Sequence, residues 1–458
     1  MLFLLFWSAA FCVAGIGGGS LASWDEAYYA IVSRGIFRSG DWINLTYFDT
    51  PFYDKPPLYF WVTTVFYRLF GVNEFATRLC SALAGIGVVL VTYFIGKRLL
   101  GRAAALAGAG ILLSSSDFLH YARWGTLDIT HLFFFSLAIL FYLKSVERPV
   151  FWFVFWLSAT GAVMTKGPLI VLAIPLIVLD SCLRKDLSFI KKAPFWGGLA
   201  VFFLAALPWH IAAYHAHPDL FTRNFLYKHL IERTTGAVEG HTGNWYFYIR
   251  TLINKYHPWI FLAPAALPWA LWRARVDEKK RAYRFLIFWV VLVLGFFTFA
   301  VQTKLQWYTL LMYPALSLLL GAFSSQVIFR GGHEWAHKAA TAAVLILHIF
   351  FSGVITQDYS PALKELSGFV KASVPPGRTV FLYEYHDEPA AKFYFDRPIR
   401  YADSLFELDA AMKESDRFFL MVPEDKFVRL SVVFAEKGLR KIAGTQAHKT
   451  DLVFLART

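Results

Sequence analysis

The sequence predicts a mainly α-helical membrane protein that ends in a small α/β domain. Of its 458 residues, 57% are hydrophobic and only 17% are charged. The mean hydropathy of +0.47 is too high for an ordinary soluble multidomain protein. Apolar stretches of about 20 residues, the length that crosses a bilayer as a helix, recur until about residue 356. Beyond that point, short β-prone runs alternate with helical patterns.

We predict one transmembrane domain over residues 1–356, with about eleven transmembrane helices. They are expected to begin near residues 2, 76, 103, 128, 150, 168, 195, 258, 284, 305 and 338. No basic segment precedes the first apolar stretch, so we expect an uncleaved first span rather than a signal peptide that is removed.

The positions of Lys and Arg orient these spans. If Met1 is cytoplasmic, every connection on the cytoplasmic side is basic: 97–102, 144–148, 184–192, 273–284 and 330–338. Such an excess is typical of cytoplasmic loops. The formal net charge of +13 therefore indicates orientation and not nucleic-acid binding, because the cations are spread between apolar runs. Two long loops, at about 20–75 and 214–257, are then extracytoplasmic.

The first outer loop contains two patterns with apolar residues at helical spacing, "EAYYAIVSRGIF" and "PPLYFWVTTVFYRLF". We expect them to form extracytoplasmic amphipathic helices that lie in the membrane interface. Residues 357–458 contain the β-prone runs "RTVFLYEY", "DRFFLMVP" and "TDLVFLART" between helical patterns, which predicts a small extracytoplasmic α/β domain. The three cysteines show no CxxC spacing, so neither a disulfide framework nor a zinc-cysteine site is indicated.

Charged and aromatic residues recur in the outer connections, and each has an ordinary structural explanation when taken alone. Asp25, Glu26 and Asp128 could cap helices, and Asp54 with Lys55 could form a surface ion pair. A loop histidine such as His241 is usually exposed or structural, and a lysine at a span end can extend toward lipid headgroups. The residues concerned are Asp25, Glu26, Asp54, Lys55, Asp128, His241, Lys304 and Tyr308. Their convergence from distant segments on one membrane face favours a functional site.

The order of motifs adds a family resemblance. Over residues 20–320 the chain contains "WDEAYYA", "SGDW", "YDKPPLYFW", "FGVNEFATRL", "YARWGTLD", "MTKGPL", "HPWIFLAPAALPW" and "KLQWYTLLMYPAL". In this order and spacing the sequence resembles the GT-C superfamily of membrane glycosyltransferases, in the branch of the lipid A aminoarabinose transferase (ArnT) and, more distantly, the protein O-mannosyltransferases. The resemblance implies a GT-C fold and an active site at the periplasmic face of the bacterial inner membrane.

The resemblance also implies roles for individual residues. Asp25 matches the family's catalytic-centre aspartate, and Asp128 matches a second important aspartate at the start of a span. Lys55 matches the lysine that faces the donor phosphate, and Asp54 matches its acidic neighbour. His241 matches a loop histidine that can share a metal with that neighbour. The chain departs from the family in having Asp54 where the family has Glu, and in lacking the arginine that often follows the acidic pair.

The implied donor is a sugar on a polyprenyl phosphate, whose cleavage builds negative charge that cations should stabilise. We assign this role to Lys55, with Lys304 and Tyr308 as helpers. For a hydroxyl acceptor, Asp25 would be the general base; for a phosphate acceptor it would orient the acceptor or stabilise the sugar. Glu26 and Asp128 complete the set of catalytic candidates. Direct displacement predicts inversion at the anomeric carbon.

No cofactor is required for this chemistry, and a divalent metal ion (Zn, Mg or Mn) is compatible with Asp54 and His241. The expected partners are the donor, a lipid or glycan acceptor such as lipid A, and membrane lipids. Three alternatives remain open: transfer to protein Ser/Thr, a transporter of lipid-linked sugars, and a glycan-binding scaffold without turnover. Few ionisable residues fall at mid-span, which disfavours the transporter.

Overall fold

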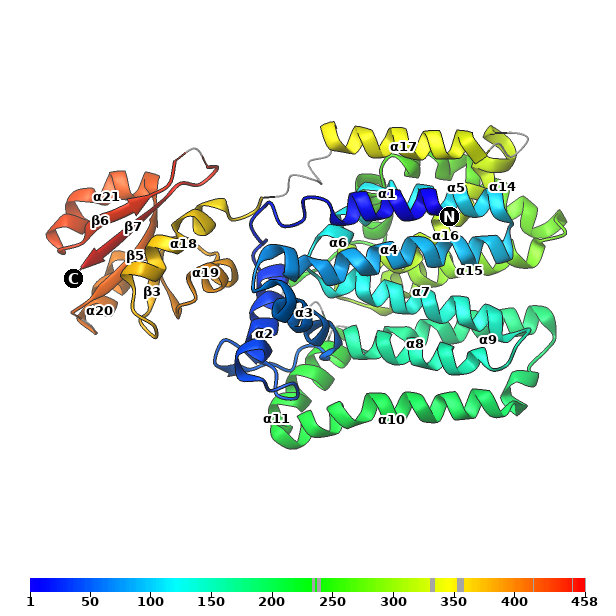
Figure 1. Ribbon diagram of the computed structural model, residues 1–458, viewed down its shortest axis with the longest axis horizontal. Helices are drawn as coiled ribbons and strands as arrows, with labels where there is room; N and C mark the ends of the chain where they lie inside the picture. Colours follow the sequence, from blue (N-terminus) through cyan, green and yellow to red (C-terminus); the bar gives the residue numbers. More distant parts are fainter. Residues whose placement is uncertain are drawn as a thin grey trace.

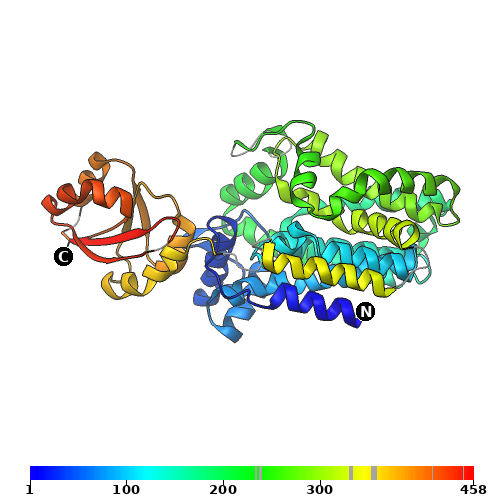
Figure 2. The ribbon, with the colours of Figure 1, turned by 90° about the horizontal axis from the view of Figure 1, so that it is seen from above.

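The computed structural model describes residues 1–232, 235–236, 240–329, 334–351, 358–414, 416–446 and 448–457. Most helices of residues 1–351 run side by side along one direction, and a sheet domain lies beyond one end of them (Figure 1). Seen from above, helices α2 (Asp25–Ser39) and α3 (Leu58–Phe70) lie between these two parts (Figure 2). The predicted domain boundary at residues 356–357 falls outside the described residues.

Two very short strands join α2 to α3 in the helical part. Its other elements are α1 (Leu2–Val13), β1 (Thr46–Tyr47), β2 (Thr50–Pro51), α4 (Glu74–Leu99), α5 (Arg102–Leu113), α6 (Ser116–Arg123), α7 (Leu127–Ser145), α8 (Phe151–Lys166), α9 (Ala173–Arg184), α10 (Ala193–Ala216), α11 (Pro218–Phe221), α13 (Phe247–Lys255), α14 (Ala263–Val276), α15 (Lys280–Gly295), α16 (Tyr313–Phe323) and α17 (Glu334–Phe351). Short segments of 3₁₀-helix or π-helix extend several of them, including η1 (Pro168–Leu172), η5 (Trp259–Leu262), η6 (Phe296–Ala300), η7 (Gln306–Met312) and η8 (Ser324–Ile328).

Several of these helices are suited to cross a membrane. Among the described residues, five are long and apolar enough: 74–99, 127–145, 193–216, 280–300 and 306–328. The bent pair α5 and α6 would add a sixth. Helical elements begin within a few residues of every predicted start, but α1, α8, α9 and α14 contain only 12 to 16 residues. The prediction of several apolar spans is confirmed, and the number eleven stays a prediction.

Helix α4 lies at the centre of the bundle, in contact with α1, α3, α5 and α7. The side chain of Asn73 accepts a hydrogen bond from the amide of Ala76 (2.9 Å) and so caps the start of α4. Lys97 and Arg98 occupy its last turn, where cations interact favourably with the helix dipole. The helix therefore starts at one end of the bundle and ends in basic residues at the other.

The C-terminal residues form a five-stranded sheet in the order β4-β3-β5-β7-β6. Strand β3 is parallel to β4 and β5, whereas β7 is antiparallel to β5 and β6. Alternate residues of β3 and β5 pack on opposite faces, so both strands are buried on both sides. The elements are α18 (Pro361–Ser373), β3 (Val380–Tyr383), α19 (Glu388–Phe395), β4 (Ile399–Ala402), α20 (Leu405–Lys413), β5 (Phe418–Pro423), α21 (Glu424–Glu436), β6 (Arg440–Gly444) and β7 (Leu452–Arg457).

Helix α2 connects the two parts through an apolar contact. Ala27, Ala30 and Ile31, all on α2, are buried in the same hydrophobic cluster as residues of α18, α19 and the sheet. A sheet face and a helix face that share one cluster cannot separate without exposing apolar surface to water, which costs about 25 cal/mol for each Å². The C-terminal domain therefore holds α2 in place.

Polar contacts reinforce this junction. Arg34 of α2 is buried and donates hydrogen bonds to the carbonyl oxygens of Phe393 (2.8 Å) and Lys392 (3.1 Å) on α19. Its guanidinium also forms an ion pair with Asp396 at 3.4 Å. The hydroxyl of Tyr394 donates to Glu74 at the start of α4 (3.0 Å). These bonds link the C-terminal domain to both α2 and α4.

Candidate functional site

Asp25 is the first residue of α2, and the chain enters this helix through a strained residue. Trp24 has φ +62° and ψ −122°, a backbone conformation that residues other than glycine rarely adopt. Asp25 is partly buried and accepts a hydrogen bond from the side chain of Tyr29, one turn further along α2. Its position in the first turn of α2 also favours negative charge. The local structure thus holds a carboxylate in one orientation at the boundary of the bundle.

Three other charged side chains lie near Asp25. Burial raises the pKa of the Asp25 carboxyl above its ordinary value, and the neighbouring carboxylate of Asp128 raises this pKa further. The ammonium groups of Lys55 and Lys166, together with the Tyr29 hydrogen bond, act in the opposite direction and lower it. We call Asp25, Lys55, Asp128 and Lys166 the charged cluster. It combines residues from the segment between α1 and α4 with residues from two helix ends.

Asp128 and Lys166 form an ion pair within this cluster. Asp128 lies in the first turn of α7, and Lys166 is the last residue of α8. Since α7 and α8 are connected neighbours, the start of one meets the end of the other. Only 8% of the Asp128 side chain and 13% of the Lys166 side chain are exposed. The Lys166 ammonium also lies 5.6 Å from the centre of the Tyr308 ring.

Lys166, in the motif "MTKGPL", belongs to the charged cluster although the sequence indicated no role for this residue. One signal in the sequence could have indicated it: Lys166 ends an apolar helix immediately before Gly-Pro, on the face where the other candidates lie. Its partner could not be predicted, because the pairing depends on how α7 and α8 pack.

Asp54 and Lys55 follow β2, directly before the two prolines that precede α3. Both side chains are partly buried. The adjacent Tyr53 is buried, and its ring lies 5.7 Å from that of His217 at the end of α10. His241 is exposed, and the described part of the chain contains no group of three or more His, Cys, Asp or Glu side chains that could hold a metal. The metal role of Asp54 and His241 stays a prediction.

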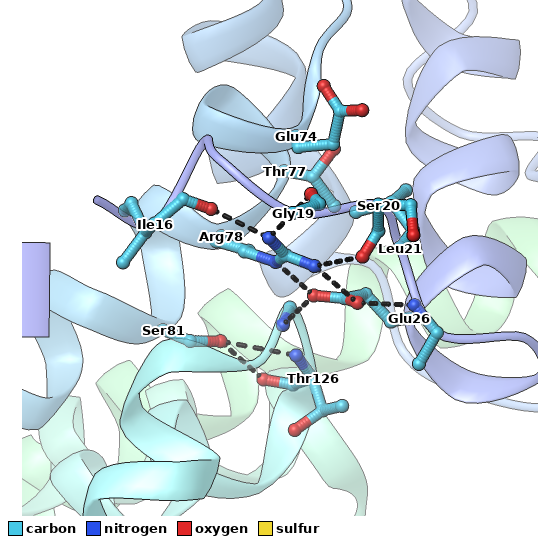
Figure 3. A network of polar contacts seen from close by, with 12 residues as sticks. Ile16, Gly19, Ser20, Leu21, Glu26, Glu74, Thr77, Arg78, Ser81 and Thr126 are labelled. Atoms are coloured by element: carbon cyan, nitrogen blue, oxygen red, sulfur yellow. Dashed lines mark hydrogen bonds and ion pairs between the residues drawn. The ribbon is translucent and has the colours of Figure 1, made fainter. Parts of the chain in front are cut away.

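Glu26 follows Asp25 in the chain but has different neighbours (Figure 3). Its carboxylate forms a two-point ion pair with Arg78 of α4, at 2.6 Å and 3.0 Å. The backbone amides of Ala22 (2.7 Å) and Gly125 (2.9 Å) donate to the same carboxylate. All four bonds are buried. Glu26, predicted as a catalytic candidate, is thus positioned as the centre of a structural network that we call the Glu26 clamp.

The clamp ties the first loop to the bundle. Arg78 also donates to the carbonyl oxygens of Ile16 (2.7 Å), Gly19 (3.1 Å) and Ser20 (2.8 Å) (Figure 3). One arginine therefore fixes the chain that leads from α1 to α2. At Gly125, a Cβ atom would lie 3.0 Å from Thr77 and 3.3 Å from Glu26. Glycine is the residue that lets the backbone approach the clamp this closely.

Lys304, predicted to assist at the donor phosphate, has its ammonium directed toward the backbone. It donates to the carbonyl oxygens of Phe297 (2.8 Å), Thr298 (2.7 Å) and Val301 (2.5 Å). An ammonium has three N–H groups, so these carbonyls use all of them and Lys304 caps the end of η6. Tyr308 stacks on Phe297 at 4.3 Å and reaches the charged cluster through Lys166.

Some of the buried polar atoms without a hydrogen-bond partner lie in the loops at this end, and others are spread through the described residues. Within the described residues they include Ser23 Oγ, Tyr53 Oη, Trp124 Nε1 and Thr126 Oγ1. Buried polar atoms are nearly always paired in folded proteins. Ser23, Tyr53 and Thr126 each lie within two residues of Asp25, Asp54 or Asp128.

Comparison with known proteins supports the family resemblance. Residues 54–211 match the model of the dolichyl-phosphate-mannose-protein mannosyltransferase family. The chain is 30% identical over 312 residues to the undecaprenyl phosphate-alpha-4-amino-4-deoxy-L-arabinose arabinosyl transferase 1 of Pseudomonas fluorescens; the match covers 65% of this chain and 54% of that protein. The chain thus spans about half the length of such relatives.

Solved structures agree on the fold. The crystal structure of ArnT from Cupriavidus metallidurans bound to undecaprenyl phosphate superposes with a TM-score of 0.77 at 19% identity, covering 100% of this chain and 97% of that one. The Archaeoglobus fulgidus oligosaccharyltransferase gives a TM-score of 0.59 at 12% identity, over 95% of this chain and 71% of that one. The predicted resemblance to the ArnT branch of the GT-C superfamily is confirmed.

Proposed function

We propose that this protein is an inverting glycosyltransferase that moves a sugar from a polyprenyl-phosphate donor to a lipid or glycan acceptor, at the extracytoplasmic face of a bacterial inner membrane. The charged cluster carries the proposal. It sets one carboxylate with a raised pKa beside two ammonium groups, at the end of an apolar helical bundle. A donor with a lipid tail and a phosphate headgroup needs both features.

The two lysines suit the donor phosphate. When the bond between sugar and phosphate breaks, negative charge builds on the phosphate, and cations in a partly dry site stabilise this charge more than they would in water. Lys55 and Lys166 supply such cations beside Asp25. Lys166 would then be shared between Asp128 and the phosphate. The printed names of the relatives, which include undecaprenyl phosphate, support this type of donor.

Asp25 is suited to act as the general base for a hydroxyl acceptor. The environment raises its pKa, so its ionised form is a stronger base than an ordinary aspartate. Asp25 would take the proton from the acceptor hydroxyl as that oxygen attacks the anomeric carbon and polyprenyl phosphate leaves. A single displacement of this kind inverts the anomeric configuration. No step requires a metal, and Asp54 and His241 alone do not make a complete set of metal ligands.

The acceptor has two candidates. A lipid or glycan acceptor, of which lipid A is one example, is favoured by the resemblance to the aminoarabinose transferases. Transfer to Ser or Thr of a protein is favoured by the match of residues 54–211 to the protein mannosyltransferase family. In both cases Asp25 would take the proton from the attacking hydroxyl.

The test is a reconstitution with purified protein in lipid nanodiscs. Undecaprenyl-phosphate sugars are supplied as donors, with lipid A in one arm and a Ser/Thr-rich peptide in another. We expect acceptor-dependent release of undecaprenyl phosphate by the wild type, and none by Asp25→Asn. Binding of donor without turnover in every arm would instead favour a glycan-binding scaffold. In sealed vesicles, movement of intact donor between leaflets without sugar release would favour a transporter.

A further inference from the structure

The end of the bundle opposite the charged cluster contains a basic cleft. Its volume is about 280 Å³. Three cationic side chains and one acidic side chain line it, together with an apolar floor: Arg98, Lys279, Arg281, Glu147, Leu99, Leu143, Val146 and Ala282. The cations come from three places, the last turn of α4, the turn before α15, and the first turn of α15. The cleft is therefore formed by tertiary packing.

The cleft lies at the other membrane boundary. Arg78, in the Glu26 clamp, and Arg98, in the cleft, are both on α4. Their separation of 20 residues corresponds to about 30 Å along the helix axis at 1.5 Å per residue, which is the thickness of the hydrocarbon core. A molecule in the cleft therefore cannot reach the charged cluster.

The cations of the cleft are held in place by bonds that leave donor groups available. Lys279 Nζ donates to the carbonyl oxygen of Leu100 (2.9 Å). Arg281 bonds the buried Asp180 through Nε (2.7 Å) and Nη2 (3.0 Å). Within the described part of the chain, Asp180 also pairs with Arg184 (3.2 Å), so one carboxylate is shared by two arginines. The cleft retains an excess of positive charge.

Arg98 has an exchangeable partner. It pairs with Glu147 at 2.6 Å, but 69% of the Glu147 side chain is exposed, and an exposed ion pair contributes little free energy. A phosphate could replace this carboxylate, since the planar guanidinium matches its oxygens. The apolar floor beside the cations would contact the glycerol and the first carbons of an acyl chain.

We propose that this cleft binds the headgroup of an anionic glycerophospholipid from the leaflet at that end of the bundle. The required chemistry is a phosphodiester with one negative charge and an apolar tail that stays in the bilayer. Basic pockets between transmembrane helices bind such headgroups in other membrane proteins. This proposal does not depend on the proposed transferase activity.

The experiment compares two variants of equal charge. Arg98→Gln with Lys279→Gln removes two cations from the cleft. Arg275→Gln with Lys185→Gln removes two exposed cations from the same end of the bundle, outside the cleft. Each protein is placed in phosphatidylcholine nanodiscs, and retention of added phosphatidylglycerol is measured by native mass spectrometry. We expect about twenty-fivefold weaker retention in the cleft variant, at about fivefold for each removed cation, and a much smaller loss in the control.

Equal loss in both variants, or unchanged retention in the cleft variant, would overturn the proposal. Inorganic phosphate at millimolar concentration should not displace the lipid; full displacement would show a free-phosphate site instead. A photoreactive phosphatidylglycerol, used on the wild type, provides a readout that does not depend on how the variants fold. We expect its crosslinks on residues 97–102 and 276–282, and crosslinks confined elsewhere would contradict the assignment.

Discussion

The charged cluster and the Glu26 clamp lie side by side at one end of the bundle, and both contain a carboxylate from the start of α2. In the clamp, one guanidinium and two backbone amides donate to Glu26. In the charged cluster, Asp25 accepts from Tyr29 and faces a second carboxylate as well as two lysines. Of these two adjacent acids, Glu26 thus accepts hydrogen bonds from three donor groups, whereas Asp25 accepts one from Tyr29 and lies beside another carboxylate.

This difference separates stability from reactivity. A buried carboxylate with a full set of donors fixes the parts of the chain that surround it. A carboxylate whose pKa is raised by burial and by a like charge is costly to keep ionised, and such groups gather at functional sites. We therefore expect the Glu26 clamp to control folding and the charged cluster to control catalysis. Five experiments test this distinction and the packing that supports it.

The largest effect is expected for Asp25→Asn. Removing a general base lowers the rate by about 10²- to 10⁴-fold, measured as sugar transfer in nanodiscs. Because the folded state raises the pKa of Asp25, any stability it contributes is present only at low pH and is lost as the pH rises through that pKa. At pH 7 the variant should therefore melt at the same temperature as the wild type or higher. Wild-type turnover would refute the catalytic assignment.

Glu26→Gln should instead lower the stability of the protein, because Glu26 is the centre of the clamp. It leaves the buried guanidinium of Arg78 without its counter-charge, and removing one partner of a buried ion pair costs about 3 to 5 kcal/mol of unfolding free energy. The measurement is denaturant unfolding in detergent. Glu278→Gln, at an exposed position, is the control and should change little. A stable Glu26→Gln protein with no activity would place Glu26 in the charged cluster instead.

Lys166→Ala and Lys304→Ala distinguish a lysine of the charged cluster from a lysine that bonds backbone carbonyls. We expect Lys166 to bind the donor phosphate. Loss of a hydrogen bond to a charged group costs about 1.5 to 3 kcal/mol, so Lys166→Ala should lower kcat/KM for the donor by about 10- to 100-fold. Lys304 bonds three backbone carbonyls, so its removal should lower the melting temperature and leave the donor KM of the folded fraction unchanged. The reverse result would restore Lys304 as the phosphate ligand.

Arg34→Ala tests whether the C-terminal domain positions Asp25. Arg34 is buried against α19, whereas Arg38 pairs with the same Asp396 from an exposed position. We expect Arg34→Ala to cost about 1 to 3 kcal/mol of stability, because the buried carbonyl of Phe393 loses the donor that Arg34 supplies. Its kcat should fall several-fold with the donor KM unchanged. Arg38→Ala should resemble the wild type, since exposed pairs contribute about 0 to 1 kcal/mol.

The smallest effect concerns pH. A general base must be ionised, so kcat/KM should fall as the pH is lowered through the raised pKa of Asp25, above the ordinary aspartate value of about 3.9. Asp128→Asn removes the like charge that helps to raise the pKa of Asp25. The pH below which the residual activity of this variant falls should therefore be lower than in the wild type. The measurement is the pH profile of single-turnover transfer. A shift to higher pH would show that Asp128 does not act on Asp25 as a like charge.

The sequence predicts which segments of the chain meet at the charged cluster, but not which partners their single side chains take. The motifs that contain Asp25, Lys55 and Asp128 were predicted to converge on one membrane face, and the structure places these three residues together. The same reasoning grouped Glu26 with Asp25 because the two are adjacent. It could not separate their roles, since the partners of Glu26 come from residues 22, 78 and 125.

The sequence by itself determined the apolar helices, the basic connections and the order of the polar motifs, because hydrophobic length, charge and helix ends are local properties of the chain. Tertiary structure alone decided which acid pairs with which base. Asp128 meets Lys166, Glu26 meets Arg78, and Lys304 turns to backbone carbonyls. These choices depend on how helices pack, since a buried charge takes the partner that packing brings within hydrogen-bond distance.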